Sequence, residues 1–108
     1  MEGDGNYMSS MDRFSEPTLF ILISLADGNK HGYAIMEDIE TSYDLKIGPG
    51  TLYGAINRME KLMLIEALPS YDRKKPYRIT SKGRLYLQEK LKEIETVTKL
   101  GFERLGLI

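Results

Sequence analysis

The segment KIGPGTLYGAINRMEK, residues 46–61, combines a Gly-Pro-Gly start with positive side chains further along a predicted helix. Proline near the first helical position is typical of a helix start, and the glycines beside it leave the backbone uncovered. The unpaired N–H groups and partial positive charge of such a start attract phosphate oxygens. Arg58 and Lys61 could contact phosphate or a guanine edge. The segment therefore predicts binding of a phosphate-bearing polymer.

The formal net charge of −1 hides an uneven charge distribution. Residues 1–45 contain 2 basic and 9 acidic side chains, a balance of −7. Residues 46–84 contain 9 basic and 3 acidic side chains, a balance of +6, and residues 85–108 contain 4 of each. The middle third is thus a basic patch suited to a polyanionic partner, although a charge run can also be no more than a solvated face.

The composition argues against catalytic and metal-dependent functions. The chain has no cysteine and one histidine, which excludes disulfides and zinc–thiolate sites and leaves few catalytic bases. It has no phosphate-loop motif and no carboxylates paired on a plausible cleft, so we expect neither an enzyme nor a cofactor. The longest apolar run, residues 19–23, is far shorter than the roughly 20 residues of a membrane span. The N-terminus lacks a signal-peptide pattern, so we expect a cytoplasmic protein with no membrane partner.

At 108 residues the chain is expected to form one domain. Residues 1–14 are predicted to be a partly ordered tail. A first helix is predicted to start at Ser15 and to end before residues 27–29. It has almost no polar face, so we expect it to be covered on more than one side. A second helix is predicted over residues 31–42, followed by a short extended link.

A third helix is predicted over residues 49–63, with an apolar stripe facing the core and small and basic residues opposite. The stripe consists of Leu52, Ile56, Met59 and Met63, and the opposite side of Thr51, Gly54, Ala55, Arg58 and Lys61. Residues 64–68 and 76–80 alternate like the strands of a hairpin with a basic tip. Thr80 and Ser81 are good caps for a last helix over residues 82–105.

The order helix, helix, helix, hairpin, helix is that of a winged helix-turn-helix. The predicted fold is mainly α with a small β-hairpin and a long C-terminal dimerisation helix. In such modules the third helix enters the major groove of DNA with its N-terminal residues nearest the bases. The small residues Thr51, Gly54 and Ala55 would let this helix lie deep in the groove. We place a DNA-binding domain at residues 15–80 and a dimerisation helix at residues 81–108.

Five short motifs follow one another along the chain: HGY at residues 31–33, PGTLY at 49–53, RME at 58–60, LI at 64–65 and YRIT at 77–80, followed by Gly83. Together they resemble the PadR family of bacterial transcription regulators. The resemblance covers roughly residues 16–90. It implies a homodimeric repressor on a pseudo-palindromic operator of double-stranded DNA, dimerised through its first and last helices, and in some members a response to small aromatic or hydrophobic effectors. Gly54 departs from the family pattern, and the single last helix resembles the shorter C-terminal subfamily, whose effector pocket would form at the dimer interface.

Two sets of candidate residues follow. The predicted DNA contacts are Tyr33, Lys46, Gly48, Gly50, Thr51, Tyr53, Gly54, Arg58, Lys61, Arg73, Lys74, Lys75 and Arg78. The predicted dimer contacts are Leu19, Phe20, Ile23, Leu87, Leu91, Ile94 and Leu105. By motif position, the resemblance implies that Tyr53 lies near a phosphate and that Lys75 and Arg78 are basic positions of the wing.

These assignments have plainer alternatives. His31 is more simply a helix cap or a packed residue than a ligand contact, and Tyr33 and Tyr53 could pack instead of binding phosphate. Gly48 and Gly50 could be turn residues only. The methionines of the second and third helices could line a ligand pocket but are more simply core, and the last helix could pack on its own domain. The alternative function is a winged-helix module that binds an acidic protein partner.

Overall fold

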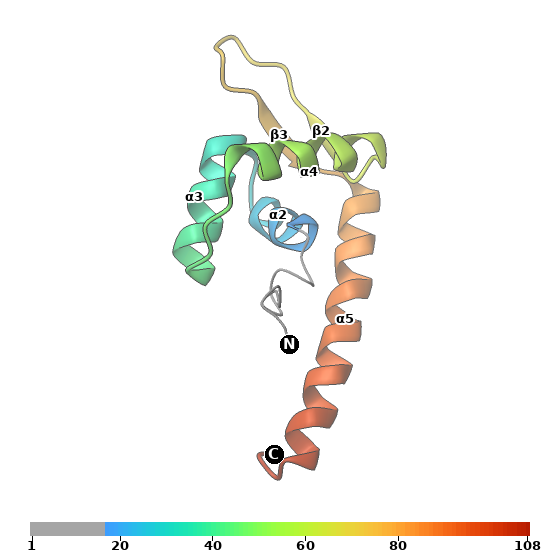
Figure 1. Cartoon of the computed structure of the whole chain (residues 1–108). Coiled ribbons are helices and arrows are strands. Elements are labelled where there is room, and N and C mark those ends of the chain that lie inside the picture. Colours follow the sequence, from blue (N-terminus) through green and yellow to red (C-terminus); the bar gives the residue numbers. More distant parts are fainter. Residues whose placement is uncertain (1–16) are drawn as a thin grey trace.

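The computed structural model describes residues 17–108, which form four helices and a three-stranded antiparallel sheet (Figure 1). The helices are α2 (Thr18–Ala26), α3 (Gly32–Tyr43), α4 (Pro49–Lys61) and α5 (Ser81–Arg104). The strands are β1 (Lys30–His31), β2 (Ile65–Ala67) and β3 (Pro76–Ile79). The β2–β3 hairpin extends beyond α4 as a wing, and α5 runs away from the other helices (Figure 1). This arrangement confirms the predicted winged helix-turn-helix fold.

Local signals fix the ends of the first two helices. The predicted cap at Ser15 lies outside the described residues, in which α2 begins after Pro17. At the start of α3, Nδ1 of His31 accepts a hydrogen bond from the Ala34 N–H at 3.2 Å. The helix ends at Asp44, whose φ of 54° closes it in the left-handed conformation. The plainer prediction for His31, a helix cap, is therefore confirmed.

The predicted apolar stripe of α4 is confirmed except at its last position. Leu52, Ile56 and Met59 are almost completely buried. Met63 is 66% exposed, so its prediction as a core residue is wrong. The reason is that α4 ends at Lys61 and the chain turns at Met63 with a φ of 63°, which takes this side chain off the helical stripe.

The sheet has one strand more than the predicted hairpin. β2 and β3 pair antiparallel with Ile65 opposite Ile79. β1 pairs with the other edge of β3, with Lys30 opposite Tyr77 and His31 opposite Pro76. A strand of two residues is too short to produce an alternating pattern, so the sequence did not reveal it. Its consequence is that the start of α3 is joined directly to the base of the wing.

One core unites these elements, and α2 lies at its centre. The buried apolar residues are Phe20, Ile21, Leu22, Leu25, Ile35, Ile39, Leu52, Ala55, Ile56, Met59, Leu64, Ile65, Tyr77, Ile79 and Leu87. The one buried polar residue among residues 17–108 is Ser24, whose hydroxyl donates to Asp38 Oδ2 at 2.6 Å. α2 contacts α3, α4, α5 and β3, so the expectation that it is covered on several sides is confirmed.

α5 begins inside the domain and ends outside it. Thr80 caps the helix, as predicted, because its side chain accepts a hydrogen bond from the Gly83 N–H at 2.9 Å. Gly83 and Leu87 are buried, whereas no later residue of the helix is. The projecting helix elongates the molecule to 53 × 32 × 24 Å (Figure 1). Its last turns are therefore open to solvent or to a partner.

Candidate nucleic-acid interface

The start of α4 leaves its backbone uncovered on the outer side. Gly48, before the helix, has a φ of −73° and a ψ of 160° and offers no side-chain cap to the first N–H groups. A Cβ built on Gly48 or Gly50 would meet nothing within 4 Å. Neither an unusual turn nor internal packing requires glycine at these positions, which argues against the interpretation as turn residues only. An open helix start of this kind is suited to bind phosphate.

The outer face of α4 carries further predicted contacts. Thr51, Tyr53, Arg58 and Lys61 are exposed, and Gly54 is half-exposed. The predicted position of Ala55 on this face is wrong, because Ala55 is 0% exposed. It follows Leu52 by three residues and precedes Ile56 by one, so it shares their buried face.

Predicted contacts from three segments meet around one cavity of about 300 Å³, which we call the wing cavity. The β1–α3 junction, the first half of α4 and the wing tip form its walls. Its lining residues are His31, Gly32, Tyr33, Tyr53, Arg73, Lys74, Lys75 and Tyr77. Three of these side chains are cationic and none is a carboxylate. The structure therefore brings both candidate tyrosines together with the basic wing tip, and it adds His31, which was not among the predicted contacts.

The wing tip is held by Asp72, whose carboxylate is engaged within the tip. Ser70 Oγ donates to Asp72 Oδ1 at 2.8 Å, and the Lys74 N–H donates to the same oxygen at 2.9 Å. The hydrogen bond from Ser70 and then that from Lys74 lower the pKa of Asp72 from its usual 3.8. The side chains of Arg73, Lys74 and Lys75 remain exposed, so the outer surface of the tip is positive.

Two predicted cations lie outside the wing cavity and pair with carboxylates. Arg78 Nη2 lies 2.7 Å from Glu66 Oε2, and the two residues stand opposite each other on β3 and β2. Lys46 Nζ lies 3.9 Å from Glu40 Oε2 in the link before α4. Exposed pairs of this kind are worth little in stability. The pairing nevertheless removes part of the charge that the sequence assigned to DNA contact at these two positions.

Arg58 borders a second cavity, of about 370 Å³, near the C-terminal end of α4. This cavity is lined by Thr18, Arg58, Met59, Leu62, Leu64, Lys82 and Tyr86. Lys82 Nζ donates to the Leu62 carbonyl oxygen at 2.8 Å, which ties the start of α5 to the end of α4. Lys82 belongs to the basic patch but was not a predicted contact. In the structure, Lys82 and Arg58 line this same cavity.

The described residues offer anion-binding groups rather than a metal site. No group of three or more His, Cys, Asp or Glu side chains that could hold a metal ion occurs in residues 17–108. Over the same range, none of the helices has the length and apolarity that crossing a membrane requires. The polar side chains of the wing cavity belong to histidine, tyrosine, arginine and lysine, all of which can donate hydrogen bonds to phosphate oxygens.

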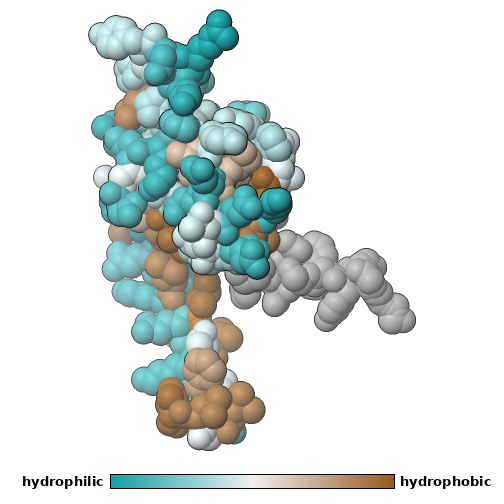
Figure 2. All heavy atoms as spheres, turned by 90° about the vertical axis from the view of Figure 1, so that its left-hand side faces the viewer, coloured by the Kyte–Doolittle hydropathy of each residue, from teal (hydrophilic) through white to brown (hydrophobic). Residues whose placement is uncertain are grey.

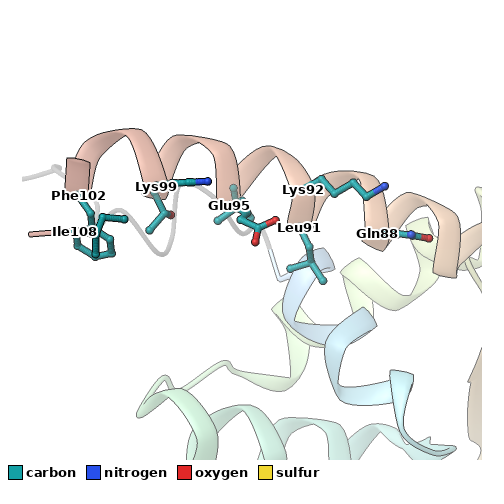
Figure 3. A pocket seen from close by; sticks show the side chains of 9 residues that line it. Gln88, Leu91, Lys92, Glu95, Lys99, Phe102 and Ile108 are labelled. Carbon is teal, nitrogen blue, oxygen red and sulfur yellow. The ribbon is translucent and has the colours of Figure 1, made fainter. Parts of the chain in front are cut away.

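The projecting part of α5 carries an apolar groove on one side (Figure 3). The groove has a volume of about 640 Å³ and is lined by Gln88, Leu91, Lys92, Ile94, Glu95, Thr98, Lys99, Phe102 and Ile108. Figure 2 shows hydrophobic residues gathered at this end of the molecule, away from the polar surface of the wing. An exposed apolar region of this kind is typical of a protein–protein contact.

The predicted dimer residues differ in how much surface they present. Leu91 and Leu105 are exposed, and Leu19, Ile23 and Ile94 are half-buried. Phe20 and Leu87 are only 6% and 7% exposed, so we correct their assignment: both belong to the core of the chain itself. Phe20 packs on Tyr43 with ring centroids 4.6 Å apart, and Leu87 lies on the part of α5 that is still within the domain.

The sequence model of the transcriptional regulator PadR-like family matches residues 21–89, from α2 to the first turns of α5. The chain belongs to the PadR-like family of transcriptional regulators. The matched range includes every element that lines the wing cavity. This PadR-like regulator therefore has the winged-helix DNA-binding fold of its family, and the earlier resemblance is confirmed.

Individual relatives agree with the family assignment. A transcriptional regulator from Clostridium thermocellum is 32% identical with a TM-score of 0.76, over 89% of this chain and 95% of that one. A PadR family transcription regulator from hypervirulent Clostridium difficile R20291 is 28% identical with a TM-score of 0.70, over 81% of this chain and 97% of that one. An uncharacterized 37.1 kDa protein in transposon TN4556 of Streptomyces fradiae is 35% identical over 84% of this PadR-like regulator. The chain spans only 26% of that relative's length.

Proposed function

We propose that this PadR-like regulator binds an inverted-repeat operator as a homodimer and represses transcription there. The observation that carries the proposal is the wing cavity, where cations and tyrosines from three segments meet beside the open start of α4. In a winged helix-turn-helix the third helix lies in the major groove with its N-terminal residues at the base edges. Docked in this way, Gly48 and Gly50 would face the phosphate backbone, and the wing tip would contact the next stretch of it.

The homodimer in this proposal is supported by α5, which leaves the domain and carries an apolar groove that no other helix or strand of residues 17–108 lines. Two copies joined along this helix would present two α4 helices to one face of a duplex. Half-sites about 34–36 Å apart, one helical turn, would then be read symmetrically, which is why we expect an inverted repeat.

We also propose that a small hydrophobic effector releases the protein from DNA by binding in the α5 groove. The apolar lining supports this assignment, because such pockets hold ligands mainly by apolar burial. Binding of the fluorescent probe 1-anilinonaphthalene-8-sulfonate to the dimer, and its loss in Thr98→Trp, a groove variant verified to remain dimeric, would test the groove as a ligand site. We place the regulator in the cytoplasm, with its operator DNA.

The decisive experiment is selection of bound sequences from a random duplex pool, followed by titration of the winning sequence. We expect an inverted repeat to be enriched, with an affinity that falls steeply with salt, at a log–log slope of about −0.9 per phosphate neutralised. Arg58→Ala should cost about 1–3 kcal/mol if Arg58 contacts a base. Enrichment of no sequence, with retained binding to an acidic protein, would favour the interaction-module alternative.

The direction of regulation needs a separate measurement. With the selected site placed over a promoter, added protein should reduce the transcript in an in vitro transcription reaction. An increase would contradict the repressor assignment while leaving DNA binding intact.

A further inference from the structure

Two polar side chains that line the wing cavity were not among the predicted DNA contacts, His31 and Tyr77. Tyr77 is only 5% exposed, so the imidazole of His31 is the more accessible of the two. Nδ1 of His31 accepts the hydrogen bond from the Ala34 N–H, so this nitrogen carries a lone pair. The neutral ring must then carry its proton on Nε2. Since Nδ1 is occupied by the cap, Nε2–H is the donor that the ring can offer to a molecule in the cavity.

The position of His31 is held from two sides. Its backbone pairs with Pro76 of β3, at the base of the wing, and its side chain is fixed by the cap of α3. The ring therefore has one orientation relative to the wall formed by Tyr33 and Tyr53 and to the cations of the wing tip. A donor fixed in this way binds an acceptor at a lower entropic cost than a mobile lysine does.

The occupant that fits the wing cavity is an anion with several oxygen acceptors. Three cationic side chains face it and no carboxylate lines it, so the charge favours a negative group. Tyr33 and Tyr53 are 65% and 43% exposed, so an external molecule can reach both side chains. The cavity also adjoins the exposed face of α4, along which a DNA strand would run in the proposed function.

We propose that the wing cavity holds one phosphodiester group of the bound DNA strand and that His31 donates its Nε2–H to it. This inference rests on the proposed function, and it identifies a single phosphate and an uncharged donor. Lys75 and its neighbours supply charge, whereas His31 and the tyrosines supply directed hydrogen bonds. The two kinds of contact differ in their response to salt, because only a cation releases counterions.

His31→Asn separates the proposed contact from the structural role of the residue. Asparagine is among the best helix caps, so its side-chain oxygen should replace Nδ1 as the acceptor for Ala34. Its shorter side chain cannot place an N–H where Nε2 lies. We expect the melting temperature to stay within about 2 °C of the parent, corresponding to a few tenths of a kcal/mol, and the affinity for the selected operator to fall about tenfold, as for a lost bond to a charged group.

The salt dependence distinguishes His31 from its cationic neighbours. His31→Asn should leave the log–log slope unchanged, whereas Lys75→Ala should reduce its magnitude by about 0.9. Lys90→Ala, on α5 but outside the residues that line its groove, serves as a control that should change neither affinity nor slope. An operator affinity of His31→Asn equal to that of the parent would overturn the proposal.

A second measurement locates the phosphate. We would replace the operator phosphates one at a time by neutral methylphosphonate. At one position the replacement should lower the operator affinity of the parent about tenfold but have little further effect on the affinity of His31→Asn. Equal sensitivity of both proteins at every position would overturn the assignment. A third outcome would also overturn it: inorganic phosphate stabilises the parent but not His31→Asn, while both proteins bind the operator with equal affinity. The cavity would then be a site for free anions and not for the DNA strand. Failure of the parent to prefer any sequence would refute the proposed function instead.

Discussion

The Tyr53 ring on α4 occupies the space that a side chain on Gly32, the first residue of α3, would need. A Cβ built on Gly32 would overlap the Tyr53 hydroxyl oxygen and lie 2.6 Å from its Cζ atom. Glycine at position 32 therefore allows the Tyr53 ring to lie across the start of α3. This contact fixes the position of one wall of the wing cavity, because Gly32 and Tyr53 both line the cavity.

Gly32→Ala should displace Tyr53 and weaken DNA binding more than it destabilises the fold. The exposed Tyr53 ring can swing outward, so we expect a loss of less than about 1 kcal/mol in the free energy of unfolding. The operator affinity should fall about five- to tenfold, the value of one hydrogen bond to phosphate. Urea unfolding and fluorescence anisotropy measure the two effects. In a Tyr53→Ala background, Gly32→Ala should change neither quantity further; an undiminished effect there would show that the clash is not with Tyr53.

Gly83→Ala should mainly destabilise the fold, because the atom nearest to the added methyl group belongs to the backbone. A Cβ on Gly83 would overlap the Leu64 carbonyl oxygen and lie 2.9 Å from Ile79 Cγ1. Neither the turn before β2 nor the start of α5 can move easily, so we expect a loss of at least about 2 kcal/mol in the free energy of unfolding. The matched control is Gly101→Ala in the same helix, which meets nothing within 4 Å and should gain about 0.5–1 kcal/mol. Chemical denaturation of both variants provides the test, and equal stabilities would contradict the close packing at Gly83.

The sequence predicted the elements of this fold better than their ends. Helical spacing placed Leu52, Ile56 and Met59 in the core, because a periodic stripe on a helix must face the other elements. The same stripe failed at Met63, since spacing carries no information on where a turn with positive φ ends the helix. β1 escaped detection because two residues cannot show a period.

The candidate site was predictable as a list of residues but not as a cavity. The basic wing tip and Tyr53 followed from charge and motif, yet their meeting with His31 depends on the pairing of β1 with β3. The sequence also could not separate the core residues of α5 from its predicted dimer residues. Leu87 is 7% exposed and Leu91, one turn later, is 42% exposed, because α5 leaves the domain between them. Hydrophobicity is the same at both positions.

Gly48→Ala and Gly50→Ala test whether the open start of α4 contacts DNA backbone. The protein itself has room for both methyl groups, so the fold should be unharmed, and Gly50→Ala, inside the helix, should gain up to about 1 kcal/mol. Each methyl would separate the backbone N–H groups from a phosphate, and the operator affinity should fall. Gly28→Ala, which also meets nothing within 4 Å but follows α2, should bind as the parent does. Anisotropy titrations in which all three variants match the parent would remove the glycines from the interface.

The wing tip should lose its order in acid. The pKa of Asp72 is lowered in the folded protein by the hydrogen bonds from Ser70 and from the Lys74 N–H, below the usual 3.8. The stabilisation that the carboxylate gives the tip is therefore fully present above pH 3.8 and is lost as the pH falls through the lower folded value. The Lys74 amide resonance, followed by NMR against pH, should titrate with a midpoint below 3.8. In Asp72→Asn this titration should disappear; its persistence would assign the effect to another group.

The groove on α5 predicts which of two similarly exposed apolar residues holds a dimer together. Phe102 and Leu100 are 43% and 46% exposed, but Phe102 follows Leu91 by about three helical turns and lines the groove, whereas Leu100 lies on the opposite side. Phe102→Glu buries a charge in the proposed interface and should yield monomers at micromolar concentration, while Leu100→Glu should remain dimeric. Sedimentation equilibrium gives the masses. A monomeric parent, or dissociation by Leu100→Glu alone, would show that the groove is not the dimer contact.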